Sequence, residues 1–177
     1  MRKYLIPDIH KRELLPLIRV ALASALVMGF YGLIHNQISY SLSPEYFTQV
    51  KFKQFHYLDF GLGDRIFAAC IGFVASSGAG LVVGWLLARR YLRNRSIDLA
   101  CKNIKLGFII VWVMAVSFAV LTGLYTAQVR PDYAVWADMI QRYAISDPRS
   151  FIQVAYMHIA SYSGGLMGVL VTLLLVK

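Results

Sequence analysis

Residues 106–125 read LGFIIVWVMAVSFAVLTGLY and contain no charged side chain. A helix needs about 20 apolar residues to cross the hydrocarbon core of a bilayer, so this stretch predicts a membrane span. Three more stretches have the same character, at about 17–35, 66–88 and 154–176, and Arg19 is the only charged residue in any of the four. The sequence therefore predicts an all-α integral membrane protein, a four-transmembrane-helix bundle that forms one domain over the whole chain.

The composition supports the membrane class. Of the 177 residues, 58% are hydrophobic and only 15% are charged, and the mean hydropathy is +0.58. A soluble domain of this length needs more charge on its surface. The net charge of +9 lies between the apolar stretches, so we expect the lipid bilayer as the partner and no nucleic acid. Cys70 and Cys101 are not spaced for a disulfide framework or a zinc knuckle.

The basic residues predict the direction of the four spans. Residues 1–19 and the short loop 89–105 carry most of the Lys and Arg side chains. The long loops 36–65 and 126–153 carry equal numbers of basic and acidic residues. By the positive-inside rule, both termini and loop 89–105 are cytoplasmic, and the two long loops lie outside. The basic inner loop is also suited to binding anionic lipid head groups.

The two outer loops are long for a four-helix bundle, and such loops usually carry structure or function. Ser43-Pro44-Glu45 is typical of a helix start, with serine as the cap and proline in the first turn. Pro131-Asp132 precedes an amphipathic pattern in the second loop. We expect a short amphipathic helix in each outer loop.

The two halves of the chain resemble each other. Gly32-Leu33-Ile34 at the end of the first span matches Gly123-Leu124-Tyr125 at the end of the third. ASSGAGL at 75–81 aligns without gaps with ASYSGGL at 160–166. These matches occur in the same order, which predicts two duplicated helical hairpins related by an axis along the membrane normal.

Polar residues that could bind a ligand gather toward the outer side of the predicted bundle. His35 ends the first span, Glu45 opens the first outer loop, and His158 lies about one turn inside the outer end of the fourth span. The candidate ligand-binding residues are His35, Asn36, Gln37, Glu45, Gln128, Asp132 and His158. Two histidines and a carboxylate are a usual ligand set for zinc or iron, so the candidate metal ligands are His35, Glu45, His158 and His56.

Three interpretations of this polar group stay open. The histidines are interfacial residues bonded to the loops, or ligands of a divalent transition metal, or groups that bind a substrate or carry protons. Ser161, His158 and Asp132 form a Ser/His/Asp set, but the sequence has no G-x-S-x-G elbow to support a nucleophile. The sequence does not decide whether the protein is an enzyme.

One stretch resembles a family of uncharacterised bacterial inner-membrane proteins. His35-Asn36-Gln37-Ile38 and then Glu45-Tyr46-Phe47-Thr48 are similar to the His-Asp-Gln-(Val/Ile) segment and the Glu-Tyr-Phe-Thr segment of that family. Asn36 stands in place of the aspartate, which weakens any role for a carboxylate there. The resemblance implies a bacterial inner membrane and directs attention to His35, Gln37 and Glu45, but it implies no activity.

The sequence thus predicts an inner-membrane protein with a polar cavity on its extracytoplasmic side that binds a ligand or a metal. One alternative is a non-catalytic partner or scaffold subunit, whose small-residue helix faces bind another membrane protein or a second copy of the chain. The other is a small oligomeric transporter. Four spans without a charged or broken helix provide little pathway in a monomer, so this second alternative requires oligomers.

Overall fold

The computed structural model describes residues 11–92 and 97–176, and within them it contains helices and no strand. The four long helices are α2 (Lys11–Leu42), α4 (Asp64–Leu92), α5 (Ile97–Gln128) and α7 (Pro148–Leu175). Each of them is long and apolar enough to cross a membrane. The predicted all-α class with four membrane-length helices is therefore confirmed.

The helices extend beyond the apolar stretches at nearly every end. The bounds of an apolar stretch mark only the residues that cross the hydrocarbon core, whereas a helix continues until its backbone hydrogen bonds end. At the start of α7, Pro148 occupies the first turn and the Asp147 carboxylate accepts a hydrogen bond from the Ser150 backbone N–H at 3.2 Å. Several basic residues behind the predicted topology lie outside the described residues, namely Arg2, Lys3, Arg93, Arg95 and Lys177.

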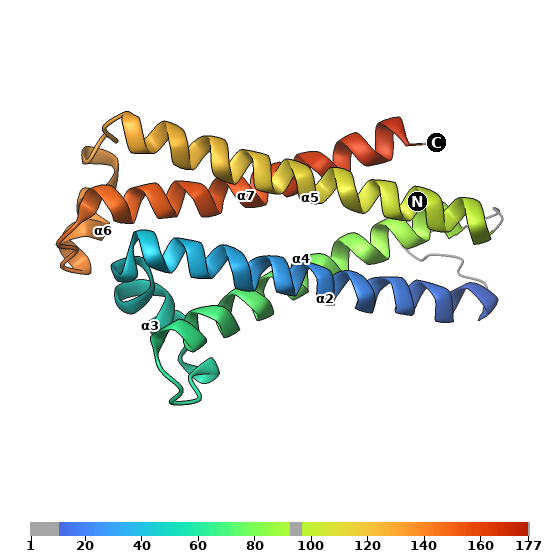
Figure 1. Cartoon of the computed structure of the whole chain (residues 1–177), viewed down its shortest axis with the longest axis horizontal. Helices are drawn as coiled ribbons and strands as arrows, with labels where there is room; N and C mark the ends of the chain where they lie inside the picture. The colour runs from blue at the N-terminus through green and yellow to red at the C-terminus, as the bar shows by residue number, and fades with distance from the viewer. Residues whose placement is uncertain (1–10, 93–96, 177) are drawn as a thin grey trace, which may run out of the picture.

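The long helices pack as two antiparallel pairs, α2 with α4 and α5 with α7 (Figure 1). Glycines bring the helix backbones close together in both pairs. A Cβ atom added at Gly32 would meet the Gly72 carbonyl oxygen and the Ser76 side chain, and one added at Gly168 would meet the Val111 backbone. Close backbone approach through small residues is the usual way in which helices associate in lipid.

Short helical elements connect the long helices at one end of the molecule, which we call the loop end (Figure 1). Between α2 and α4 lie the π-helix η1 (Tyr46–Lys51), α3 (Phe52–Gln54) and η2 (His56–Leu58). Between α5 and α7 lie η3 (Ala134–Trp136) and α6 (Ala137–Arg142). The beginning of α2 and the end of α7 lie at the opposite end.

The two hairpins are joined at both ends of the molecule. At the loop end, a buried cluster combines Tyr46 and Phe47 of η1 with Phe151 and Ile152 of α7. At the opposite end, Leu87 and Tyr91 of α4 pack against residues of α5 and the end of α7. The Tyr91 hydroxyl donates to the carbonyl oxygens of Thr172 and Val176, each at 3.0 Å. Elsewhere the two hairpins contact each other less extensively than the two helices within each hairpin do.

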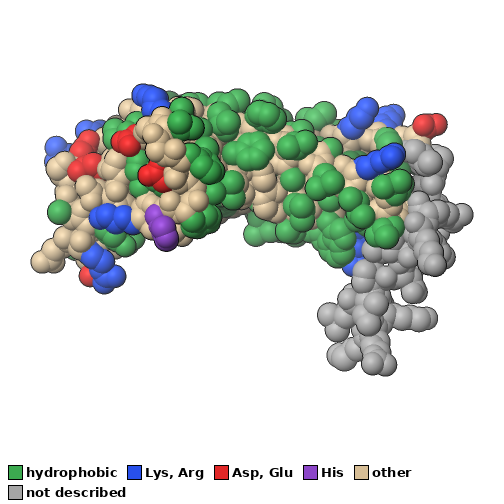
Figure 2. Space-filling view, turned by 90° about the horizontal axis from the view of Figure 1, so that it is seen from below, with side chains coloured by type: hydrophobic (Ala, Val, Ile, Leu, Met, Phe, Trp, Pro, Cys, Tyr) green, Lys and Arg blue, Asp and Glu red, His purple; other side chains and the backbone are tan. Residues whose placement is uncertain are grey.

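The surface agrees with a membrane-embedded middle. Figure 2 shows hydrophobic side chains over the central part of the visible face and charged side chains toward its two ends. Large apolar residues on the long helices are freely exposed in the isolated chain, among them Ile109, Leu121 and Leu174. Such a continuous apolar surface is expected where a protein contacts lipid.

Candidate ligand-binding site

A cavity of about 380 Å³ lies between the two hairpins, in the region between their two end contacts. This volume falls within the range of about 300–1,000 Å³ that is common for small-molecule pockets. All four long helices and η1 contribute to its wall. The lining consists of Met28, Tyr31, His35, Asn36, Phe47, Lys51, Phe55, Ile71, Gly72, Ala75, Ser76, Ala79, Val82, Val83, Leu86, Val111, Ala115, His158, Ser161, Tyr162, Gly165, Leu166 and Val169.

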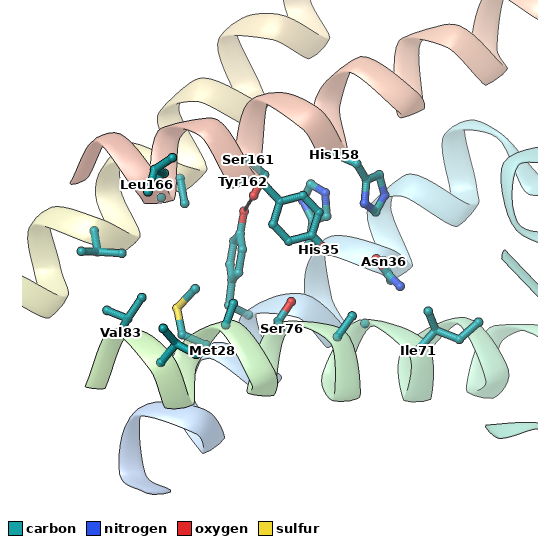
Figure 3. A pocket seen from close by; sticks show the side chains of 18 of the residues that line it. Met28, His35, Asn36, Ile71, Ser76, Val83, His158, Ser161, Tyr162 and Leu166 are labelled. Carbon is teal, nitrogen blue, oxygen red and sulfur yellow. Dashed lines mark hydrogen bonds between the residues drawn. The ribbon is translucent and has the colours of Figure 1, made fainter. Parts of the chain in front are cut away.

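Two histidines from different hairpins meet in this cavity. The rings of His35 on α2 and His158 on α7 have centroids 4.6 Å apart, and they cross edge to face (Figure 3). The Nε2 atoms of both rings are buried and have no hydrogen-bond partner in the protein. A buried polar atom without a partner costs about 1–3 kcal/mol, so each of these nitrogens is available to a ligand in the cavity.

Aromatic rings hold His158 in place. The Tyr46 ring stacks on it with centroids 4.9 Å apart, and the Phe47 ring lies at 6.2 Å. Both aromatic residues belong to η1, the wide helical turn that follows α2. Burial raises the pKa of Tyr46, so its phenol stays protonated at neutral pH. The segment after α2 thus fixes the orientation of a histidine more than 100 residues away in sequence.

A pair of hydroxyl groups lies one turn deeper in the cavity. The Tyr31 and Ser161 side-chain oxygens form a hydrogen bond at 2.7 Å, and they come from α2 and α7, as the histidines do. Tyr31 is also close to His35, with 5.7 Å between the ring centroids. The polar side of the cavity therefore runs along the line where the two hairpins face each other.

Lys51 places a positive charge at the loop end of the cavity. Its Nζ lies 5.5 Å from the centre of the Tyr46 ring and 6.0 Å from that of Phe55, and it donates a hydrogen bond to Gln54 at 3.2 Å. Burial lowers the pKa of this ammonium group. Within the described part of the chain, no Asp or Glu lines the cavity or pairs with Lys51. The charge is thus held near the cavity without a carboxylate to balance it.

The other end of the cavity is apolar and opens sideways. Val83, Leu86, Val111 and Val169 line it without a polar group, and Met28, Val83 and Leu166 lie away from the histidines in Figure 3. Some lining residues are also more than half exposed, namely Val82 (54%), Tyr162 (55%) and Leu166 (65%). Since these residues belong to the membrane-length helices α4 and α7, the opening faces the region that lipid would occupy.

The structure places the predicted residues near His35 in different roles. Asn36 lines the cavity, and its side-chain amide donates to the Ala68 carbonyl at 2.9 Å, which joins α2 to α4. The Gln37 side chain donates to the Arg65 carbonyl at 2.9 Å outside the cavity. These two residues therefore hold the first hairpin together, and only Asn36 can reach a ligand in the cavity.

Glu45 links the two connecting segments at the loop end. Its carboxylate accepts hydrogen bonds from the backbone N–H of Ser146 (3.0 Å), the Ser146 hydroxyl (2.7 Å) and the backbone N–H of Asp147 (2.8 Å). The Asp147 N–H, followed by the Ser146 hydroxyl, lowers the pKa of Glu45. Its oxygen atoms are thus engaged in fixing the turn before α7, outside the cavity lining.

The remaining predicted residues lie on the surface. His56 is exposed beside Tyr57, Gln128 is exposed at the end of α5, and the exposed Asp132 accepts a hydrogen bond from the Ala134 N–H at 2.9 Å. Of the four predicted metal ligands, only His35 and His158 come together. Among residues 11–92 and 97–176, no three His, Cys, Asp or Glu side chains are grouped as a metal site would require. Zinc or iron binding stays a prediction. Of its four predicted ligands, His35 and His158 are the two that lie together.

Sequence reasoning missed Tyr31, Tyr162 and Lys51 as residues of the site. Tyr31 precedes His35 by four residues and so shares its helix face, a signal that was readable in the sequence. Lys51 gave no such signal, because its position depends on the π-helical turn of η1. Comparisons with protein-family models, curated proteins and solved structures find no significant match to this chain.

Proposed function

We propose that the protein binds a membrane-soluble small molecule in the cavity between its two hairpins. The main observation that supports this proposal is the pair of buried, unpartnered Nε2 atoms of His35 and His158 in a cavity of about 380 Å³. The lateral opening between α4 and α7 supports entry from the lipid phase, since its exposed rim residues lie on membrane-length helices. A ligand with a hydrogen-bonding head and an apolar body matches the two ends of the cavity.

The test is to fill the cavity and compare the result with an equal change elsewhere. Gly165 lines the cavity, and a Cβ added there meets only the Ala115 side chain, at an ordinary distance of 3.9 Å. A Cβ added at Gly78 meets nothing within 4 Å, and Gly78 is outside the cavity lining. Gly165→Leu therefore occupies the cavity, and Gly78→Leu is the matched control on the exposed surface of a membrane-length helix.

The probe is n-dodecanol, measured by native mass spectrometry in a steroid-based detergent that has no alkyl chain of its own. We expect one dodecanol per wild-type chain, at least tenfold weaker binding to Gly165→Leu, and unchanged binding to Gly78→Leu. Equal binding to all three proteins would show that dodecanol sits on the lipid-facing surface, and the proposed function would then be abandoned.

We also infer that the two hairpins are repeats. In the predicted alignment Gly32 corresponds to Gly123 and Gly72 to Met157. Gly32 and Gly72 face each other in the first hairpin, and a Cβ added at Gly123 would meet Met157 in the second. The same correspondence holds for Gly80 facing Ser24 and Gly165 facing Ala115. Identical helix register supports duplication; an experimental structure in which these crossings are not equivalent would refute it.

The proposed setting is a bacterial inner membrane, with both termini in the cytoplasm and the loop end outside. The distribution of Lys and Arg between the loops supports this direction. In this orientation the histidine pair lies toward the extracytoplasmic side of the membrane. Anionic lipid at the basic end, a protein partner and a homo-oligomer remain predictions of the sequence.

A further inference from the structure

We infer that the ligand of this cavity is a single-chain amphiphile with an anionic head group, a carboxylate or a phosphate, whose head lies near Lys51 and the two histidines. This inference rests on the proposed function and specifies its ligand class. It depends on the order of side chains along the cavity, on the charge of Lys51, and on the shape of the apolar end.

The first argument concerns charge. Lys51 lines the cavity, yet it contacts the neutral Gln54 amide and two aromatic rings. Within the described residues, the only ion pair joins Arg142 to Asp138, both on α6. A cation that is partly removed from water and has no carboxylate partner is destabilising, and an anion that enters the cavity offsets that cost.

The second argument concerns hydrogen bonding at the same end. His35 and His158 each keep a buried Nε2 without a partner, and a neutral imidazole that carries its proton on this nitrogen donates a hydrogen bond. Carboxylate and phosphate oxygens accept several hydrogen bonds at once. Tyr46 stacks on His158 and its ring also lies 5.5 Å from the Lys51 Nζ, so one side chain brings the ammonium group and the histidine to the same end of the cavity.

The third argument concerns the rest of the ligand. Along α7 the lining runs from His158 through Leu166 to Val169, which spans on the order of 16 Å at the rise of an α-helix. The polar groups end at Ser161 and Tyr162, and the lining beyond them on α4, α5 and α7 is aliphatic apart from glycine. A polar end followed by a long apolar end fits one extended alkyl chain better than a compact polar solute.

Lys53 provides a matched control for the charge. It lies two residues from Lys51, is exposed, contacts Gln49 and the Tyr143 ring, and does not line the cavity. Lys51→Gln and Lys53→Gln remove the same charge from the same loop. Only Lys51→Gln removes it from the cavity, so a general electrostatic effect of the loop would appear in both variants.

The experiment measures dodecanoate, dodecyl phosphate and neutral n-dodecanol on the wild type and both variants, by native mass spectrometry in the same steroid-based detergent. We expect at least one anion to bind the wild type about tenfold or more tightly than dodecanol, and to lose that advantage in Lys51→Gln, as removal of a charged hydrogen-bond partner predicts. Lys53→Gln should match the wild type, and dodecanol should not distinguish the variants. Preference for dodecanoate indicates a free fatty acid as the natural ligand, and preference for dodecyl phosphate indicates a phosphate-bearing lipid.

Two results would overturn the inference. One is equal affinity for the anions and dodecanol in the wild type, and the other is an equal loss of anion binding in both lysine variants. Either result leaves the proposed function standing if dodecanol binding is still lost in Gly165→Leu. If dodecanol binding survives in Gly165→Leu, the proposed function itself fails, and the two failures are therefore distinguishable.

Discussion

Gly32→Ala tests the crossing of α2 and α4, the two helices that form one wall of the cavity. The added methyl group would meet the carbonyl oxygen of Gly72 and the side chain of Ser76. Because a carbonyl oxygen cannot move to another rotamer, the two helices must separate or shift. Overpacking of this kind costs about 1–3 kcal/mol, and we expect the upper end of that range because the obstacle is backbone.

Gly78→Ala is the control, since a methyl group there meets nothing within 4 Å. Both substitutions gain the same helix propensity of about 1 kcal/mol, which therefore cancels in the comparison. We expect Gly32→Ala to be less stable than Gly78→Ala by about 3 kcal/mol, or roughly a hundredfold in the unfolding equilibrium. The measurement is reversible unfolding by SDS in mixed micelles, followed by tryptophan fluorescence. Equal unfolding midpoints for the two variants would show that α2 and α4 do not cross at Gly32 and Gly72.

Three further predictions concern the Glu45 contact, the histidine pair and the membrane topology. Glu45→Gln should destabilise the protein by about 1 kcal/mol at pH 7, because the carboxylate accepts three hydrogen bonds. The pKa of Glu45 is lower in the folded than in the unfolded protein, so this contribution is present above the unfolded pKa of about 4.3 and is lost as pH falls through the folded pKa. The SDS midpoints of wild type and variant should therefore converge in acid, and a constant difference would refute the link. His35→Phe should leave the SDS midpoint unchanged or raise it, because the buried Nε2 has no partner to lose, and a fall of more than about 1 kcal/mol would reveal a hydrogen bond to that atom. In intact cells, a membrane-impermeant maleimide should label Asp59→Cys in a Cys101→Ser background and should not label the exposed Cys101 of the wild type until the cells are permeabilised; the reverse pattern would invert the proposed topology.

The four long helices were predictable because each is encoded locally. An uninterrupted apolar run such as 106–125 has few stable conformations in a bilayer other than a helix, whatever the rest of the chain does. The common depth of His35 and His158 was also predictable, since each residue lies near the loop end of its own apolar stretch. Depth alone, however, does not state which faces of two helices meet, and the 4.6 Å separation of the two rings required the structure.

The roles of Glu45 and Lys51 could not be predicted from the sequence. Both residues lie in the segment after α2, where the chain forms the π-helical turn of η1 before a short α-helical turn. A change from 3.6 to a wider turn rotates every later side chain, so a helical-wheel argument fails after Tyr46. Lys51, at the end of η1, consequently reaches the cavity. Glu45 lies before η1, and its contact with the turn before α7 joins residues about 100 positions apart, which no local sequence pattern encodes.

The histidine pair lies between the two contacts that join the hairpins, so the hairpins are held from closing together to relieve its cost. The cluster of Tyr46, Phe47 and Phe151 fixes their separation at the loop end, and the Tyr91 hydrogen bonds to α7 fix it at the opposite end. Two buried nitrogens without partners cost about 2–6 kcal/mol together in the empty protein, a large share of the 5–15 kcal/mol by which folded proteins are usually stable. A binding site can retain such groups because a bound head group supplies the missing partners, and binding of that ligand then stabilises the fold by an amount that rises with the logarithm of the ligand concentration above its Kd. Helix packing alone does not explain two imidazoles held edge to face beside a cavity, whereas ligand binding at this site does.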